Sequence, residues 1–271
     1  MVFIRERRDD RFVDFKDSFK KLPSNGYDHT FIYKHVKKLV SVKFSQILQL
    51  LQEELCTNTI YRNIWNTARA KYSNSNNNST TSTPSSLPRE CYIALIAYTM
   101  EGPLYKDFNA KLRLLKNASD WKNFNYKSLY ALLARSIHGI DNNPSVTPRY
   151  FYRAMSCRPE VLNFEVGDCI YPTQFLSCSV NKEVAVRFMG DEQATLITFH
   201  GGPLAACGIA NHSVHPEEEE ILVFPWSTFE VTKIHRSASE DVISLRSIGC
   251  LVDGLPFSGK YTREGINIIN Q

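Results

Sequence analysis

The sequence has no hydrophobic run long enough to cross a membrane. No window of its 271 residues approaches the ~18 apolar residues that a spanning helix requires. The first three residues are followed by IRERRDDR rather than by an apolar segment, and the last residues, YTREGINIINQ, are polar. Neither a secretory signal nor the hydrophobic tail of a lipid-anchor signal is recognisable. We therefore expect no membrane span.

Cysteine is sparse and irregularly placed. The seven cysteines are an odd number without regular spacing, which favours reduced thiols over a disulfide framework. Together with the missing signal segments, this predicts a cytoplasmic location. A secreted form stays open because tripeptides of the glycosylation type begin at Asn77, Asn78, Asn117 and Asn211.

Signals for metal or nucleic-acid binding are also lacking. The seven histidines have no ligand-like spacing with cysteines or acids, so we expect no metal site. The net charge of +4 is modest for this length and gives little support to a dedicated nucleic-acid surface. The chain is long enough to bury a sizeable core, as one large domain or two closely packed subdomains. We expect a monomer.

The period of the apolar residues changes at about residue 146. Before it, spacings of three and four residues predict helices at 44–55, 60–72, 92–100, 104–115 and 126–137. After it, short β-rich runs predict strands at 150–155, 168–171, 174–180, 195–200, 218–224, 229–234 and 242–247. The sequence therefore predicts an α+β protein, with a helical subdomain at 1–145 and a strand-rich core at 146–271.

A polar tract interrupts the predicted helical half. Residues 73–87 contain SNSNNNSTTSTPSS, which is too poor in apolar side chains to stay folded by burial. We expect a disordered insertion there. Its composition leaves open a phosphorylated or partner-binding segment.

Three segments of the second half carry reactive side chains within predicted strands. YFYRAMS holds Arg153 in an aromatic run, where an arginine is either paired at a sheet edge or serves as an anion clamp. FLSCSV contains Ser177, whose hydroxyl can orient a substrate or a carboxylate.

The third segment, PEEEEILVFP, runs four carboxylates into an apolar strand. In a continuous strand, Glu218 and Glu220 would share one face, about 7 Å apart, with Glu217 and Glu219 on the other. Such a charge run alone is more often a solvated strand entry. The alternation of side chains along a strand does not decide whether Glu218 and Glu220 or Glu217 and Glu219 form the functional pair.

In their order and spacing, these three segments resemble the R-S-E motif of the arginine-type mono-ADP-ribosyltransferases. Upstream, 94–112 and 124–137 look like the helical segments that precede the arginine strand in animal ecto-ADP-ribosyltransferases. The resemblance covers about 57–249. It implies that the strands form a β-sandwich of two packed sheets with an NAD cleft between them, and that the helical subdomain packs on one side.

The resemblance also assigns residues. It implies a catalytic set of Arg153, Ser177, Glu218 and Glu220, with Glu220 standing immediately before the aliphatic strand. Contacts with NAD are implied for Tyr98, Arg153, Gln174, Phe188 and Ser213. The sequence departs from the family pattern in two places: Ser177-Cys178-Ser179 replaces Ser-Thr-Ser, and Ala154 stands where glycine is common.

The reaction that the resemblance implies is transfer of ADP-ribose from NAD to an arginine side chain of a target protein, with release of nicotinamide. Nicotinamide is already cationic in NAD, so it leaves without a general acid through an oxocarbenium-like state. Glu220 would stabilise that cation, Arg153 would bind the pyrophosphate and Glu218 would orient the acceptor guanidinium. NAD is the implied co-substrate, and no metal is required. An NAD glycohydrolase and a catalytically silent binding module remain alternatives.

Overall fold

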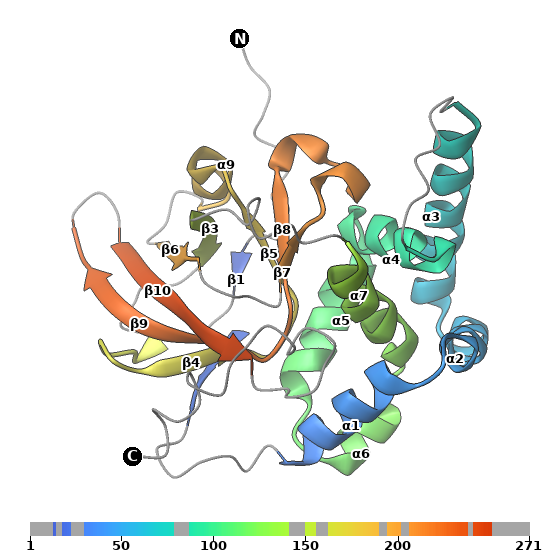
Figure 1. The fold of residues 1–271 in the computed structure, drawn as a ribbon, viewed down its shortest axis with the longest axis horizontal. Coiled ribbons are helices and arrows are strands. Elements are labelled where there is room, and N and C mark those ends of the chain that lie inside the picture. Colours follow the sequence, from blue (N-terminus) through green and yellow to red (C-terminus); the bar gives the residue numbers. More distant parts are fainter. Residues whose placement is uncertain are drawn as a thin grey trace.

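The computed structural model describes residues 13–14, 18–22, 30–78, 87–140, 150–155, 162–189, 194–201, 206–237 and 241–250. Within these residues, the long helices come first in the chain and most strands follow. Figure 1 shows the long helices gathered on one side of the molecule and the strands, together with one short helix, on the other. The α+β class predicted from the change in period is thus confirmed.

The helical side consists of α1 to α7. Their bounds are Thr30–Ser41, Phe44–Thr57, Thr59–Asn78, Arg89–Thr99, Pro103–Leu114, Ala118–Asn123 and Lys127–Gly139. All five helices predicted from periodicity are present, with ends that differ by up to six residues. Local chemistry sets several boundaries: Pro103 opens α5 after Gly102, and the Asn117 side chain accepts from two backbone amides of α6.

The helix α3 is longer than the sequence predicts. It continues to Asn78, through the first six residues of the polar tract that we expected to be disordered. A helix that is already nucleated extends at little cost, because each added residue gains one backbone hydrogen bond. The rest of the tract, 79–86, lies outside the described residues.

The strands are β1 to β10. Their bounds are Val13–Asp14, Phe19–Lys21, Tyr150–Met155, Cys169–Pro172, Leu176–Ser179, Thr195–His200, Ala206–Gly208, Glu220–Val223, Ser227–His235 and Asp241–Cys250. The first two belong to the N-terminal half that we expected to be helical: β1 pairs with β3 and β2 with β4. Short connections include the helix α9 (Lys182–Arg187) and the 3-10 turns η3 (Ala210–His212) and η4 (Pro216–Glu218).

Hydrogen bonds connect all of these described strands into one sheet, in the order β2-β4-β9-β10-β6-β3-β5-β8-β7, with β1 beside β3. The expected division into two separate sheets does not match this pairing. The parallel pair β6–β10 and the antiparallel pair β3–β6 join the two arms of the sheet. Burial patterns in a sequence indicate which faces are covered, but they do not reveal whether two arms are joined by hydrogen bonds.

An aromatic core fixes the sheet to the helices. Phe175, immediately before β5, lies against Phe108 of α5 and Tyr130 of α7, with ring centroids 5.7 and 5.2 Å apart. Phe224, immediately after β8, also packs on Tyr130. One face of the β5–β8 pair is therefore seated on the helical half, and the positions of both strands are set by burial.

Candidate functional site

The strands that carry the three predicted segments lie side by side. β5 is the neighbour of both β3 and β8. In the antiparallel register, Tyr152 faces Ser179, Ser177 faces Leu222 and Ser179 faces Glu220. Because cross-strand partners share a face of the sheet, Ser177, Ser179 and Glu220 lie on one face. The structure thus brings together segments that are far apart in the sequence.

Arg153 is buried within this group, with only 2% of its surface exposed. Its guanidinium donates a hydrogen bond from Nη1 to the main-chain carbonyl of Ser177. The contact ties β3 to β5 beyond the point where their backbone pairing ends. A guanidinium that is this well covered is costly unless it is paired, so its position is closely specified by the fold.

Glu220, the first residue of β8, is fully buried. The Tyr98 hydroxyl from α4 lies close to it, accepts from Asn109 Nδ2 at 3.2 Å and donates to the Phe175 carbonyl at 3.4 Å. The pKa of Tyr98 is raised to about 12, mainly by burial and with a contribution from the Glu220 carboxylate, while the Asn109 hydrogen bond acts in the opposite direction.

Two more groups act on the same hydroxyl. The Ser177 hydroxyl and the Arg153 guanidinium both lower the pKa of Tyr98. Burial also raises the pKa of the Cys207 thiol on β7, with Glu220 as the second cause. The predicted residues Arg153, Ser177 and Glu220 therefore all lie near the hydroxyl of a fourth, Tyr98, and all four are buried.

Glu218 does not lie on a strand. It ends the 3-10 turn η4, and β8 begins only at Glu220. The residue between them, Glu219, has the left-handed conformation, with φ at 48°. The predicted strand alternation of the two carboxylates is therefore wrong, because it assumed an extended chain from Glu218 onward. A left-handed glutamate is uncommon and cannot be anticipated from its residue type.

Hydrogen bonds from the end of β5 hold this turn in place. The Ser179 hydroxyl donates to the Glu218 carbonyl at 2.7 Å and accepts from the Asn181 amide at 3.0 Å. The Val180 amide donates to the Glu219 carbonyl at 3.3 Å. Glu218 is thus half-buried beside the strand that carries Glu220, although the connecting backbone is not extended.

The remaining predicted cofactor contacts lie around this cluster. Gln174 is buried just before β5; its amide donates to Ser18 Oγ at 3.2 Å and its carbonyl oxygen accepts from Arg113. Phe188 ends α9, a helix that packs on β3 and β5. Ser213 follows η3, and its hydroxyl accepts from the His215 amide at 3.0 Å.

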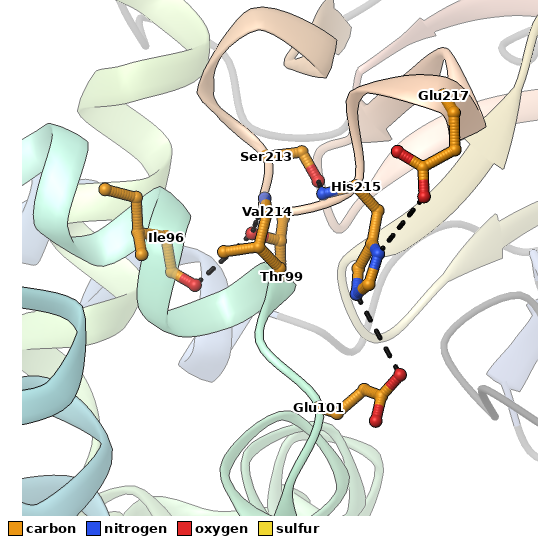
Figure 2. Close-up of polar contacts among 7 residues, drawn as sticks. All are labelled: Ile96, Thr99, Glu101, Ser213, Val214, His215 and Glu217. Atoms are coloured by element: carbon orange, nitrogen blue, oxygen red, sulfur yellow. Dashed lines mark hydrogen bonds and ion pairs between the residues drawn. The ribbon is translucent and has the colours of Figure 1, made fainter. Parts of the chain in front are cut away.

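The end of α4 supports the loop that contains Ser213. The Val214 amide donates to Thr99 Oγ1 at 3.2 Å, as Figure 2 shows. The His212 ring packs edge-on against Tyr92 of α4, with centroids 4.9 Å apart, and burial lowers the pKa of His212. α4 therefore contacts both the buried cluster, through Tyr98, and the loop before β8.

Sequence reasoning missed three polar residues of this region: Ser18, Asn109 and Arg113. Asn109 carried a weak signal, because it is a polar residue on the apolar face of a predicted helix. Arg113 and Ser18 carried none, since their contacts with Gln174 bridge segments that are distant in the sequence. Within the part of the chain that the structure describes, no group of three or more metal-binding side chains occurs, and no helix is long and apolar enough to cross a membrane.

Comparisons with known sequences identify the family. The profile of the family described as NAD:arginine ADP-ribosyltransferase matches residues 25–252. The erythroblast NAD(P)(+)--arginine ADP-ribosyltransferase of Gallus gallus is 32% identical over 170 residues, which are 62% of this chain and 54% of that protein. Ecto-ADP-ribosyltransferase 5 of Rattus norvegicus is 27% identical over 207 residues, 73% of this chain and 64% of that protein. GPI-linked NAD(P)(+)--arginine ADP-ribosyltransferase 1 of Mus musculus is 31% identical over 163 residues, 58% and 47% respectively.

Comparisons with solved structures concern the fold. The crystal structure of the eukaryotic mono-ADP-ribosyltransferase ART2.2 is similar with a TM-score of 0.61 at 21% identity, covering 87% of this chain and 93% of that one. The type III effector XopAI from Xanthomonas axonopodis pv. citri is similar with a TM-score of 0.56 at 13% identity, covering 80% and 94%. The chain spans about half the length of the first curated relatives that it matches.

These comparisons correct the predicted location. Relatives named ecto-ADP-ribosyltransferase and GPI-linked ADP-ribosyltransferase point to the cell exterior or surface, not to the cytoplasm. The prediction relied on what the two ends of the sequence lack and on the irregular cysteines, and neither observation determines where a protein works.

Proposed function

The chain belongs to the NAD:arginine ADP-ribosyltransferase family, and from this premise we propose that it transfers ADP-ribose from NAD to arginine side chains of target proteins and releases nicotinamide. One observation carries the proposal: Glu220 is fully buried at the start of β8, on the same sheet face as Ser177 and within electrostatic reach of the Tyr98 hydroxyl. A carboxylate held in a covered site favours reactions that develop positive charge.

Glu220 would act on the ribose from which nicotinamide departs. The bond to nicotinamide breaks with its electrons moving to the departing ring, and positive charge develops on the ribose carbon. A preorganised carboxylate in a low-dielectric site stabilises this charge more strongly than water does. Ser177, on the same face of the sheet, would keep the carboxylate oriented.

Arg153 would bind the pyrophosphate of NAD. The planar guanidinium suits the paired oxygens of a phosphate. Its contact with the Ser177 carbonyl supports this role, because the anion would then be held against the strand that carries Ser177. Burial makes a desolvated charge pair between guanidinium and phosphate stronger.

The other cofactor contacts remain proposals with different degrees of support. Tyr98 has the strongest, since its hydroxyl responds to Arg153, Ser177 and Glu220. Gln174 is buried just before β5, and Ser213 lies in the loop before β8. For Phe188, the support is the packing of α9 on β3 and β5.

Glu218 would bind the guanidinium of the acceptor arginine. It is half-buried, follows a turn rather than a strand, and is connected through its carbonyl to Ser179 beside Glu220. An acceptor guanidinium must be oriented and must lose a proton as it attacks, and a carboxylate near the reacting carbon serves both needs. The expected partners are proteins with an accessible arginine.

We also propose the finer architecture on the same basis: a helical subdomain within 1–145, from which β1 and β2 join the sheet, and an NAD-binding core at 146–271, whose two arms flank the cofactor. The protein would act as a monomer, without specific nucleic-acid partners. From the names of its relatives, we propose that it works at the cell surface or outside the cell.

Labelling from isotopic NAD tests the function. The purified protein is incubated with a lysate and labelled NAD, and modified peptides are sequenced by mass spectrometry. We expect ADP-ribose on arginine with the wild type and with Glu53→Gln, an exposed acid on α2, and none with Glu220→Gln.

Two results would replace the proposal. Release of free ADP-ribose without protein labelling would indicate an NAD glycohydrolase. Saturable NAD binding without any turnover would indicate a silent binding module.

A further inference from the structure

His215 lies between two carboxylates next to the buried cluster. Its Nδ1 is 3.4 Å from Glu217 Oε1, and its Nε2 is 4.0 Å from Glu101 Oε1. Figure 2 shows the ring between the two acids, with Glu217 on η4 and Glu101 in the segment that joins α4 to α5. The His215 side chain is only 16% exposed, against 71% for Glu217 and 53% for Glu101. The ring is therefore covered where the two segments meet.

The backbone around His215 leads directly to Glu218. The His215 carbonyl accepts from the Glu218 amide at 3.1 Å, so His215 is the residue from which the turn η4 starts. On its other side, the His215 amide donates to Ser213 Oγ, and the neighbouring Val214 amide donates to Thr99 of α4. His215 therefore connects the Glu101 contact to the turn that ends at Glu218.

We propose that His215 is a positioning residue for the arginine acceptor: by joining Glu217 to Glu101, it fastens η4 to the segment after α4 and holds Glu218 in place. This inference rests on the proposed function and extends it to the acceptor step. The Nδ1 atom is within hydrogen-bonding distance of Glu217, and Nε2 on the opposite side of the ring faces Glu101 at ion-pair distance.

The same geometry predicts which steps of the reaction do not depend on His215. Glu220 is held by four consecutive register pairs between β5 and β8 and is fully buried. Loss of a contact between η4 and the α4–α5 segment does not alter that register. NAD cleavage should therefore be insensitive to the His215 side chain. NAD binding should change little, because the main-chain amide of residue 215 still donates to Ser213, while capture of a guanidinium depends on the side chain.

Steady-state kinetics with a small acceptor test the inference. We compare wild type, His215→Ala, His215→Gln, Glu101→Gln and the double variant His215→Ala/Glu101→Gln, with agmatine as the guanidine acceptor. His215→Ala should raise the KM for agmatine about threefold to tenfold, the effect of losing two partly exposed side-chain contacts with carboxylates. The KM for NAD, and NAD hydrolysis without acceptor, should stay within about twofold.

The other variants distinguish loss of the link between His215 and Glu101 from a general loss of folded structure. His215→Gln keeps one donor and should recover part of the agmatine KM. The double variant should be no worse than His215→Ala alone, because both substitutions remove the same link. His235→Ala, an exposed histidine on β9, is the matched control and should behave as wild type.

Several results would overturn the inference. These are an unchanged agmatine KM in His215→Ala, a parallel fall of transfer and hydrolysis, and fully additive effects of the two single substitutions. A wild type that hydrolyses NAD but never modifies agmatine or protein would refute the proposed function itself. In that case, the rate of amide hydrogen exchange in 210–219 still tests the link between His215 and Glu101. Equal rates in wild type and His215→Ala would show that this link does not hold the segment in place.

Discussion

The strand pair β5–β8 and the loop from 209 to 219 lie next to each other and differ in how they are held. The strand pair has a fixed register, fully buried side chains and an aromatic core beneath it. The loop consists of two 3-10 turns with mostly half-exposed or exposed residues, and side-chain contacts from α4 and Ser179 fasten it. Glu220 belongs to the first region and Glu218 to the second.

In the proposed function, this difference would separate two tasks within one reaction. Bond cleavage in NAD requires charges at fixed positions, and a buried strand would supply them at no cost of reorganisation. Acceptance of a protein arginine requires a surface that a partner can reach, and an anchored loop would supply it. The two carboxylates are two residues apart in the sequence, but they are subject to different physical constraints.

The largest effect is expected for Glu220→Gln. The substitution preserves the shape of the side chain and removes its charge, so transfer and NAD hydrolysis should both fall about 10²- to 10³-fold. Rates in the presence and absence of agmatine measure the two activities, and circular dichroism confirms the fold. Retention of either activity at wild-type level would contradict the assignment of Glu220 to the shared step.

A smaller effect is expected for Ser179→Ala, which cuts the link between the two regions. The hydroxyl donates to the Glu218 carbonyl and accepts from the Asn181 amide, and the loss of such hydrogen bonds costs about 1–2 kcal/mol of stability. Transfer should fall several-fold more than hydrolysis. Denaturant unfolding and the two rates are the measurements; equal losses would mean that Ser179 supports the strand pair and not the loop.

The smallest effect concerns pH and His212. Burial lowers the pKa of His212, so its folded pKa lies below its unfolded value of about 6.5. The loop is then fully stable above pH ~6.5 and loses stability as pH falls below it, because the undocked state binds more protons.

Amide protection factors measure this loss. In the His215→Gln background, which removes the neighbouring imidazole, protection of 209–213 should decrease between about pH 7 and pH 5.5. His212→Phe should remove the dependence. Persistence of the dependence in that variant would assign it to another group.

Much of the site could be predicted from the sequence. The arginine strand, the Phe-x-Ser-x-Ser strand and the aliphatic strand after Glu220 are each defined by local β patterns, and their resemblance to a known family placed them together. The structure adds the strand order, in which β5 lies between β3 and β8. Buried strands are predictable in this way because register and burial follow from apolar patterning.

The loop could not be predicted to the same degree. The four glutamates indicated a continuing strand, yet Glu219 is left-handed and Glu218 ends a 3-10 turn. The contacts that fix this arrangement come from Ser179 and Thr99, which are distant in the sequence. The same reason explains β2, which pairs with β4 across about 150 residues. Short elements held by tertiary contacts leave little trace in local patterns.

Glu218→Gln, assayed for transfer and hydrolysis in the same preparation, tests the division of labour most directly. The variant keeps the Glu218 carbonyl that Ser179 holds and removes only the side-chain charge. We predict that transfer to agmatine falls about 100-fold while NAD hydrolysis stays within about threefold of wild type, the range expected when one catalytic group of two is removed. Equal loss of both activities would contradict the separation of the acceptor carboxylate from the cleavage step.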